Sequence, residues 1–117
     1  PLTRETQNLL DAKRLRLLKP GAGLVNIGRA AVVDYAALVQ GLDSGAIGGA
    51  VLDVFDPEPL PSESPLWAQP NLVITPHVSA DDGNAYVSLT LDVFFNNMRR
   101  LIQDEALENQ VNTALGY

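Results

Sequence analysis

Short apolar runs bounded by glycine or proline recur along the chain, and residues with helical spacing lie between them. Three such runs predict β-strands, because strands are usually four to eight residues long and end at turn residues: Gly23–Gly28, Ile47–Val54 and Leu72–Thr75. Between the first two, Asp34 precedes Ala37, Leu38 and Leu42 at helical spacing. This pattern predicts a helix that is capped by Asp34 and runs to about Asp43.

Two further helices flank these strands. Asp11 is a good N-cap for a helix over Ala12–Leu18, which Lys19, Pro20 and Gly21 end. Asp81 or Asp82 is expected to cap a last helix that runs to about Gln103. Its apolar residues gather near one face, which predicts that they belong to a core together with Trp67: Tyr86, Leu89, Val93, Phe94, Met98 and Leu101.

The order strand, helix, strand, loop, strand, helix predicts an α/β fold with a parallel sheet and right-handed crossovers. Three strands make half of a doubly wound domain, and they leave a sheet edge that another segment should cover. Residues 105–117 lack periodicity and are expected to form a tail.

Composition narrows the class of partner. The chain has 117 residues and a formal net charge of −6, which disfavours nucleic acid as a partner. It has no cysteine and a single histidine, so disulfides and His- or Cys-based metal clusters are excluded. There is no signal peptide and no apolar run of membrane-spanning length, so no membrane is expected and a cytoplasmic protein fits. The start at Pro1 suggests part of a longer polypeptide.

The stretch from Ala50 to Pro59 carries two acids in unusual places. Asp53 interrupts an apolar strand, where a carboxylate costs stability unless it is paired. Glu58 lies between Pro57 and Pro59, which remove backbone donors and stiffen the loop. Asp53 could also bond a neighbouring backbone amide and do nothing else.

Three polar side chains follow the three expected strands: Arg29, Glu58 and His77. If the strands are parallel, all three reach the same sheet edge, where α/β sheets bind ligands. A guanidinium can bind a carboxylate through two parallel hydrogen bonds. A histidine beside a carboxylate can transfer a proton. The alternatives are a surface arginine, a solvated glutamate and a histidine that merely ends a strand. Asp81 and Asp82 are interpreted as a cap, not a metal site.

Several blocks of the sequence together resemble the D-isomer-specific 2-hydroxyacid dehydrogenases. They occur in the family's order and spacing: Lys19–Ala22, Val25–Arg29, Ala50–Pro61 and Thr75–His77. The ending, from Gln110 to Tyr117, most resembles the glyoxylate/hydroxypyruvate reductase A branch.

The resemblance implies that residues 1–104 form the C-terminal half of a Rossmann-type, NAD(P)-binding domain. Residues 105–117 would return toward a substrate domain that this chain does not contain. The implied reaction is hydride transfer between NAD(P)H and a small 2-oxo acid such as glyoxylate or hydroxypyruvate, giving the 2-hydroxy acid. The implied catalytic residues are Arg29, which holds the substrate, His77, which protonates the keto oxygen, and Glu58, which orients His77.

The same resemblance implies the cofactor contacts. Asp53 matches the acid near the nicotinamide carboxamide. The remaining implied residues line NAD or NADP together with Arg29 and His77: Ile27, Gly28, Ser79 and Ala80. A homodimer is implied for the full-length protein.

The sequence departs from the family at two points. Ala30 replaces the usual glycine, which would cost about 1 kcal/mol if the site required a positive φ. The phosphate-binding glycine motif is absent, since Gly21, Gly23 and Gly28 do not have its spacing. We therefore expect no turnover by the isolated 117 residues. Two other functions stay open: a cofactor-sensing regulator that binds partner proteins, and an inactive fragment.

Overall fold

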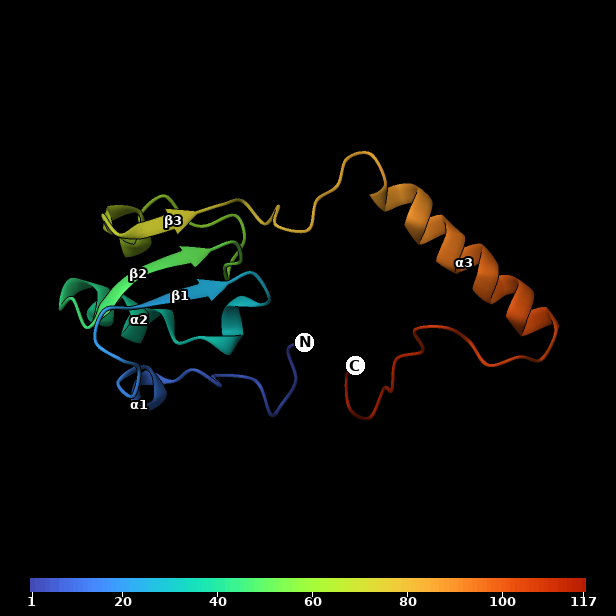
Figure 1. Ribbon diagram of the computed structural model, residues 1–117, viewed down its shortest axis with the longest axis horizontal. Helices are drawn as coiled ribbons and strands as arrows, with labels where there is room; N and C mark the ends of the chain where they lie inside the picture. Colours follow the sequence, from blue (N-terminus) through green and yellow to red (C-terminus); the bar gives the residue numbers. More distant parts are fainter. The chain divides into compact units, whose positions relative to one another are not determined.

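A three-stranded parallel sheet forms the centre of residues 1–79 (Figure 1). The structure is a computed structural model of residues 1–117, which fall into two compact units, 1–79 and 80–117. The strands β1 (Ala22–Asn26), β2 (Ile47–Leu52) and β3 (Leu72–Ile74) lie in the order β1-β2-β3, and both pairs are parallel. The predicted α/β fold with a parallel sheet is confirmed. Each strand ends one or two residues before its predicted end, which lengthens the loops that follow.

Short helices precede or connect the strands, and acidic or hydroxyl side chains cap three of the four. They are α1 (Ala12–Leu15), the 3-10 turn η1 (Ala30–Val32), α2 (Tyr35–Asp43) and the 3-10 turn η2 (Pro65–Ala68). The side chain of Asp11 accepts a hydrogen bond from the N–H of Arg14, and that of Asp34 accepts one from Ala37, so both predicted caps are confirmed. The helix predicted over residues 12–18 stops at Leu15, because Leu17 is 78% exposed and no second apolar turn packs against the core.

The core of this unit lies on the face of the sheet that α2 covers. Leu38 of α2 and Leu52 of β2 are completely buried, and Ile47 is nearly so. On the opposite face Val25 and Val73 are more than half exposed, since side chains alternate across a strand. The core therefore anchors the strands, and the loops at their C-terminal ends remain accessible.

Two glycines allow a close approach between β2 and the turn that leads into β1. A Cβ atom built on Gly48 would lie 2.5 Å from the carbonyl oxygen of Gly21, which is closer than real atoms approach. Gly21 itself has a φ of 75°, a left-handed conformation that glycine adopts without strain.

The unit of residues 80–117 consists of one long helix, α3 (Tyr86–Ile102), followed by the tail. The predicted cap is wrong: the N-cap is Ala85, and no side chain caps the helix. The carboxylate of Asp82 instead accepts a hydrogen bond from the N–H of Asn84, while its backbone carbonyl accepts one from Tyr86. Because the carboxylate of Asp82 is engaged in this local turn, it does not cap the helix as the sequence predicted.

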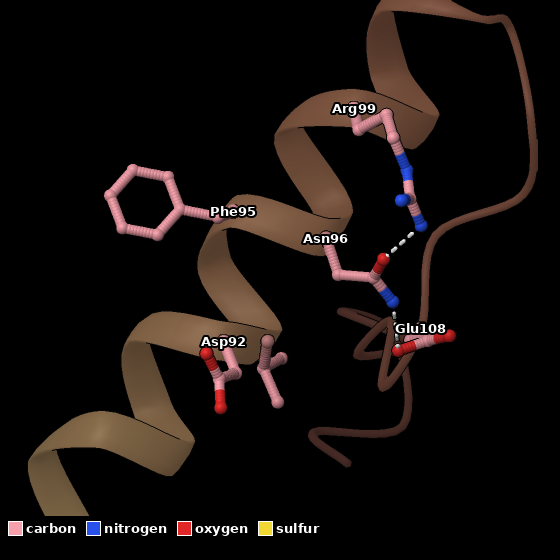
Figure 2. Close-up of a pocket in the computed structure, with 6 residues that line it drawn as sticks. Asp92, Phe95, Asn96, Arg99 and Glu108 are labelled. Atoms are coloured by element: carbon pink, nitrogen blue, oxygen red, sulfur yellow. Dashed lines mark hydrogen bonds between the residues drawn. The ribbon is translucent and has the colours of Figure 1, made fainter.

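Glu108 ties the tail back to α3. Its carboxylate accepts hydrogen bonds from Asn96 at 3.0 Å and Arg100 at 2.8 Å, and its backbone pairs with the side chain of Asn97. These two side-chain bonds, in that order, lower the pKa of Glu108 below its ordinary value of 4.5. Figure 2 shows Asn96 between Arg99 and Glu108 at one wall of a pocket of about 440 Å³. In this wall Asn96 accepts a hydrogen bond from Arg99 and donates one to Glu108.

The predicted core face of the last helix is wrong for this chain. No residue of α3 is buried, and Trp67 in the other unit is 54% exposed. Within residues 80–117 no second helix or strand covers the apolar face of α3. None of the helices is both long enough and apolar enough to cross a membrane.

Candidate functional site

The loops that follow the three strands leave the sheet at the same edge (Figure 1). They contain the three predicted polar residues. Arg29 lies three residues after β1, Glu58 lies in the proline-rich loop after β2, and His77 lies three residues after β3. The structure brings Glu58 and His77 into direct contact. Arg29 makes no hydrogen bond to either of them, although its charge contributes to lowering the pKa of Glu58.

The carboxylate of Glu58 has one partner on each oxygen. The N–H of Phe55 donates to Oε1 at 2.7 Å, and Nδ1 of His77 lies 2.9 Å from Oε2. The hydrogen bond from His77 and then that from Phe55 hold the pKa of Glu58 below its ordinary value of 4.5, and the charges of His77 and Arg29 act in the same direction. Glu58 is therefore an ionised, oriented acceptor.

His77 has a backbone conformation that few residues other than glycine adopt. Its φ is 58°, in the left-handed region. Because the Glu58 carboxylate only accepts hydrogen bonds, Nδ1 carries the hydrogen in their contact. The other ring nitrogen, Nε2, makes no hydrogen bond within the chain, and the side chain is 45% exposed. The ring is thus held at one nitrogen and free at the other.

Asp53 is completely buried and organises the turn that contains His77. Its Oδ1 accepts hydrogen bonds from the hydroxyl of Thr75 at 2.5 Å and from the N–H of Val78 at 2.9 Å, and its Oδ2 accepts one from the N–H of Ser79 at 2.9 Å. Burial alone would raise the pKa of Asp53, but the hydrogen bonds from Thr75, Ser79 and Val78 hold it well below its ordinary value of 3.8. The bonded residues lie on both sides of His77.

The backbone around Arg29 is held by two residues that the sequence analysis did not single out, Asn26 and Tyr35. Asn26 is buried and donates to the backbone carbonyl of Arg29 at 3.1 Å and to the hydroxyl of Tyr35 at 3.0 Å. Its Oδ1 accepts a hydrogen bond from the N–H of Gly28. An asparagine inside an apolar strand was the available sequence signal, since a buried amide requires partners.

Ala30, which stands where the family usually has glycine, does not have the strained positive φ that this replacement could have caused. It begins η1, and it is not among the residues with positive φ. The conditional cost of a left-handed alanine therefore does not arise here.

Of the residues expected to line a cofactor, Ile27, Gly28 and Ser79 lie in the loops at this edge. Ile27 and Gly28 follow β1 directly, and Ile27 is 57% exposed. Ser79 is held by Asp53, and Ala80 is the first residue of the second unit. No group of three or more His, Asp or Glu side chains is arranged to hold a metal ion.

A largely apolar cavity of about 440 Å³ borders the Glu58–His77 pair. Its lining combines the pair with loop and strand residues: Phe55, Pro59, Leu60, Trp67, Ile74 and Pro76. The indole N–H of Trp67 donates to the carbonyl of Pro61, which holds the ring in the proline-rich loop.

Comparison with known proteins identifies the family. Residues 1–79 match the family model described as D-isomer specific 2-hydroxyacid dehydrogenase, NAD binding domain, and this range coincides with the first compact unit. The chain belongs to the D-isomer specific 2-hydroxyacid dehydrogenases, as the sequence blocks indicated.

Individual relatives agree with this assignment. Glyoxylate/hydroxypyruvate reductase B of Pectobacterium carotovorum is 46% identical over 113 residues, which is 96% of this chain and 35% of that protein. Glyoxylate/hydroxypyruvate reductase A of Salmonella paratyphi B is 38% identical over 117 residues, all of this chain and 36% of that protein. A crystal structure of a D-isomer specific 2-hydroxyacid dehydrogenase from Xanthobacter autotrophicus Py2, in complex with NADPH and MES, matches with a TM-score of 0.92 at 44% identity, covering 100% of this chain and 47% of that one. The chain spans little more than a third of these two reductases.

Proposed function

We propose that the whole protein is an NAD(P)-dependent 2-hydroxyacid dehydrogenase that reduces a small 2-oxo acid, such as glyoxylate or hydroxypyruvate, to the 2-hydroxy acid. The observation that carries this proposal is the contact of 2.9 Å between His77 and Glu58 at the C-terminal edge of a parallel sheet. Family membership supports the reaction class, and the names of the two reductases support the substrate class.

In this proposal His77 is the general acid. Glu58 holds the hydrogen on Nδ1 and fixes the plane of the ring, so Nε2 can present a proton to the keto oxygen of the substrate. The carboxylate also stabilises the protonated ring before the proton leaves. In the reverse direction the same nitrogen accepts the proton of the 2-hydroxyl group.

Arg29 is proposed to bind the substrate carboxylate. Its Nη1 donates to the carbonyl of Gly28 at 2.8 Å, and its other guanidinium nitrogens make no hydrogen bond within the chain. An arginine with free donors can bind a carboxylate through two parallel hydrogen bonds. Arg29 is exposed, so its guanidinium is accessible to an anion.

The residues at this edge fit a nicotinamide cofactor, NAD or NADP. Exposed Ile27 and Val78 offer an apolar surface, and Gly28 has no side chain to obstruct a ring. When bound, the reduced nicotinamide supplies the hydride that the carbonyl carbon receives. We assign Asp53, Ser79 and Ala80 to its surroundings together with Ile27, Gly28, Arg29 and His77. The NADPH in the Xanthobacter structure supports this choice of cofactor.

The remaining features of the whole protein belong to the same proposal. Residues 1–104 would complete the nucleotide-binding domain, and residues 105–117 would return toward a substrate domain. We further propose a homodimer in the cytoplasm.

The test is oxidation of NADPH or NADH by the whole protein in the presence of glyoxylate or hydroxypyruvate. We expect His77→Ala to lower kcat by roughly 10²–10⁴, the usual contribution of a general acid. Asn109→Ala is the matched control, because Asn109 also has a positive φ, of 53°, and lies on the exposed tail. Equal turnover by the wild type and His77→Ala would refute the role of His77. Cofactor binding with no turnover of any oxo acid would favour a regulatory protein.

A further inference from the structure

The hydroxyl of Tyr35 joins two parts of the candidate site that are far apart along the chain. Tyr35 is the first residue of α2, and its ring packs edge-on against Phe55, with ring centroids 6.3 Å apart. Its hydroxyl donates to the carbonyl oxygen of Val54 at 2.7 Å. It also accepts a hydrogen bond from the side-chain amide of Asn26 at 3.0 Å. A hydroxyl has one hydrogen, so these two bonds use its single donor and one acceptor site.

The first part of the site that this hydroxyl connects is the turn of Arg29, through the side chain of Asn26. The two hydrogens of the Asn26 amide go to the carbonyl of Arg29 and to Tyr35, and Oδ1 of Asn26 accepts from the N–H of Gly28. Every polar atom of the Asn26 side chain is therefore engaged with the turn after β1 or with Tyr35. The turn that presents Arg29 depends on the orientation of this amide.

The second part is the Glu58–His77 pair, which the hydroxyl reaches through the peptide group between Val54 and Phe55. The carbonyl of Val54 and the N–H of Phe55 belong to the same peptide group. Tyr35 donates to the carbonyl end of that group, and the N–H end donates to Oε1 of Glu58 at 2.7 Å. The second oxygen of Glu58 contacts His77. Hydrogen bonds in such a series polarise and strengthen one another.

Tyr35 is suited to this role because its hydroxyl stays neutral. Burial raises the pKa of Tyr35 to about 12, and the nearby charge of Glu58 acts in the same direction, against the hydrogen bond from Asn26. The hydroxyl consequently keeps its hydrogen for Val54 at neutral pH.

We propose that Tyr35 is a positioning residue whose hydroxyl keeps the Arg29 turn and the Glu58 loop in a fixed relation, through Asn26 on one side and the Val54–Phe55 peptide on the other. This inference rests on the proposed function, because it assigns Arg29 and the Glu58–His77 pair to one reaction. Tyr35 itself touches neither substrate nor cofactor in this proposal.

The test is Tyr35→Phe, which removes the hydroxyl and keeps the ring against Phe55. The first measurement is amide hydrogen exchange at single residues in the whole protein. We expect exchange at Phe55 and Gly28 to become about 3- to 10-fold faster, the effect of one lost hydrogen bond. The amide of Ala50, which bonds Asn71 inside the sheet, serves as an internal reference and should not change. Unchanged exchange at Phe55 and Gly28 would overturn the proposal.

The second measurement is steady-state reduction of glyoxylate. We expect kcat/KM for glyoxylate to fall about 3- to 10-fold in Tyr35→Phe, with the KM for the nicotinamide cofactor unchanged. Tyr86→Phe is the matched control, since Tyr86 is 61% exposed and its hydroxyl makes no hydrogen bond. Faster exchange with unchanged kinetics would show that the hydroxyl is merely structural and would also overturn the proposal. If the whole protein reduces no oxo acid, the proposed function fails, while the exchange measurement still decides whether Tyr35 holds the two loops.

Discussion

Nδ1 of His77 lies 2.9 Å from Oε2 of Glu58, although 19 positions separate the two residues along the chain. The parallel order of β2 and β3 brings their following loops to the same edge, and two further contacts fix the pair. The N–H of Phe55 holds the carboxylate, and Asp53 holds the turn on both sides of the histidine. The ring is oriented by the surrounding backbone as well as by its acidic partner.

Replacing Glu58 by glutamine should lower kcat of the whole protein about 10- to 100-fold, which is part of the total effect of general acid catalysis. Glutamine keeps the shape of the side chain but loses the charge that stabilises the protonated ring. The measurement is the initial rate of glyoxylate reduction at saturating cofactor. Glu63→Gln is the control, because Glu63 lies in the same loop and its carboxylate accepts a hydrogen bond only from the hydroxyl of Ser62. A kcat equal to that of the wild type would remove Glu58 from the mechanism.

The contacts of Glu58 should also make stability depend on pH. The pKa of Glu58 in the folded chain lies below its ordinary value of 4.5, which we take for the unfolded chain. The stabilisation is therefore fully present above about pH 4.5 and is lost as the pH falls through the folded value. We expect the difference in unfolding free energy between wild type and Glu58→Gln to shrink as the pH falls below about 4.5. Denaturant titrations between pH 3 and 7, on the order of the range that carboxyl groups cover, would test this; a difference that grows on acidification contradicts it.

Asp53→Asn should loosen the turn that carries His77. The amide nitrogen of asparagine would face a donor in at least one of the three contacts from Thr75, Val78 and Ser79, so one hydrogen bond must be lost. We expect amide exchange at Val78 or Ser79 to be at least about tenfold faster. Asp43→Asn is the control, because Asp43 is exposed and its Oδ1 accepts a hydrogen bond from the side chain of Gln69. Retained protection at both amides would mean that Asp53 does not hold the turn.

Gly48→Ala should destabilise the first unit by about 1–3 kcal/mol, because the new methyl group would overlap the backbone of Gly21. A backbone atom cannot rotate away as a flexible side chain can. Gly23→Ala provides the comparison in the neighbouring strand, where the nearest atom to a new Cβ is 3.9 Å away. Chemical denaturation of both variants measures the effect, and equal stabilities would argue against close packing at Gly48.

The convergence of Glu58 and His77 was accessible from the sequence because it depends only on the order and direction of strands. Hydrophobic runs located the strands, and Pro57 and Pro59 marked the stiff loop. The caps Asp11 and Asp34 were predicted correctly for a similar reason, since capping is a local interaction.

Hydrogen bonds between polar side chains that are far apart along the chain could not be predicted from the sequence. Nothing in the pattern around Tyr35 indicates that its hydroxyl reaches Val54, 19 positions away, or that Asn26 bonds both Arg29 and Tyr35. The predicted cap of α3 failed because Asp82 closed a tighter turn of its own. Burial of Trp67 was wrongly predicted because hydrophobicity alone does not reveal which elements cover a side chain.

The left-handed backbone of His77 implies that folding and turnover favour different amino acids at this position. A residue with a Cβ costs about 1–3 kcal/mol in such a conformation, whereas glycine tolerates it and asparagine adopts it more readily than most. A mutational scan that scores cellular abundance separately from enzymatic rate should accordingly rank glycine and asparagine above histidine in abundance. If His77 donates the proton as proposed, the ranking by rate should be the reverse of the ranking by abundance.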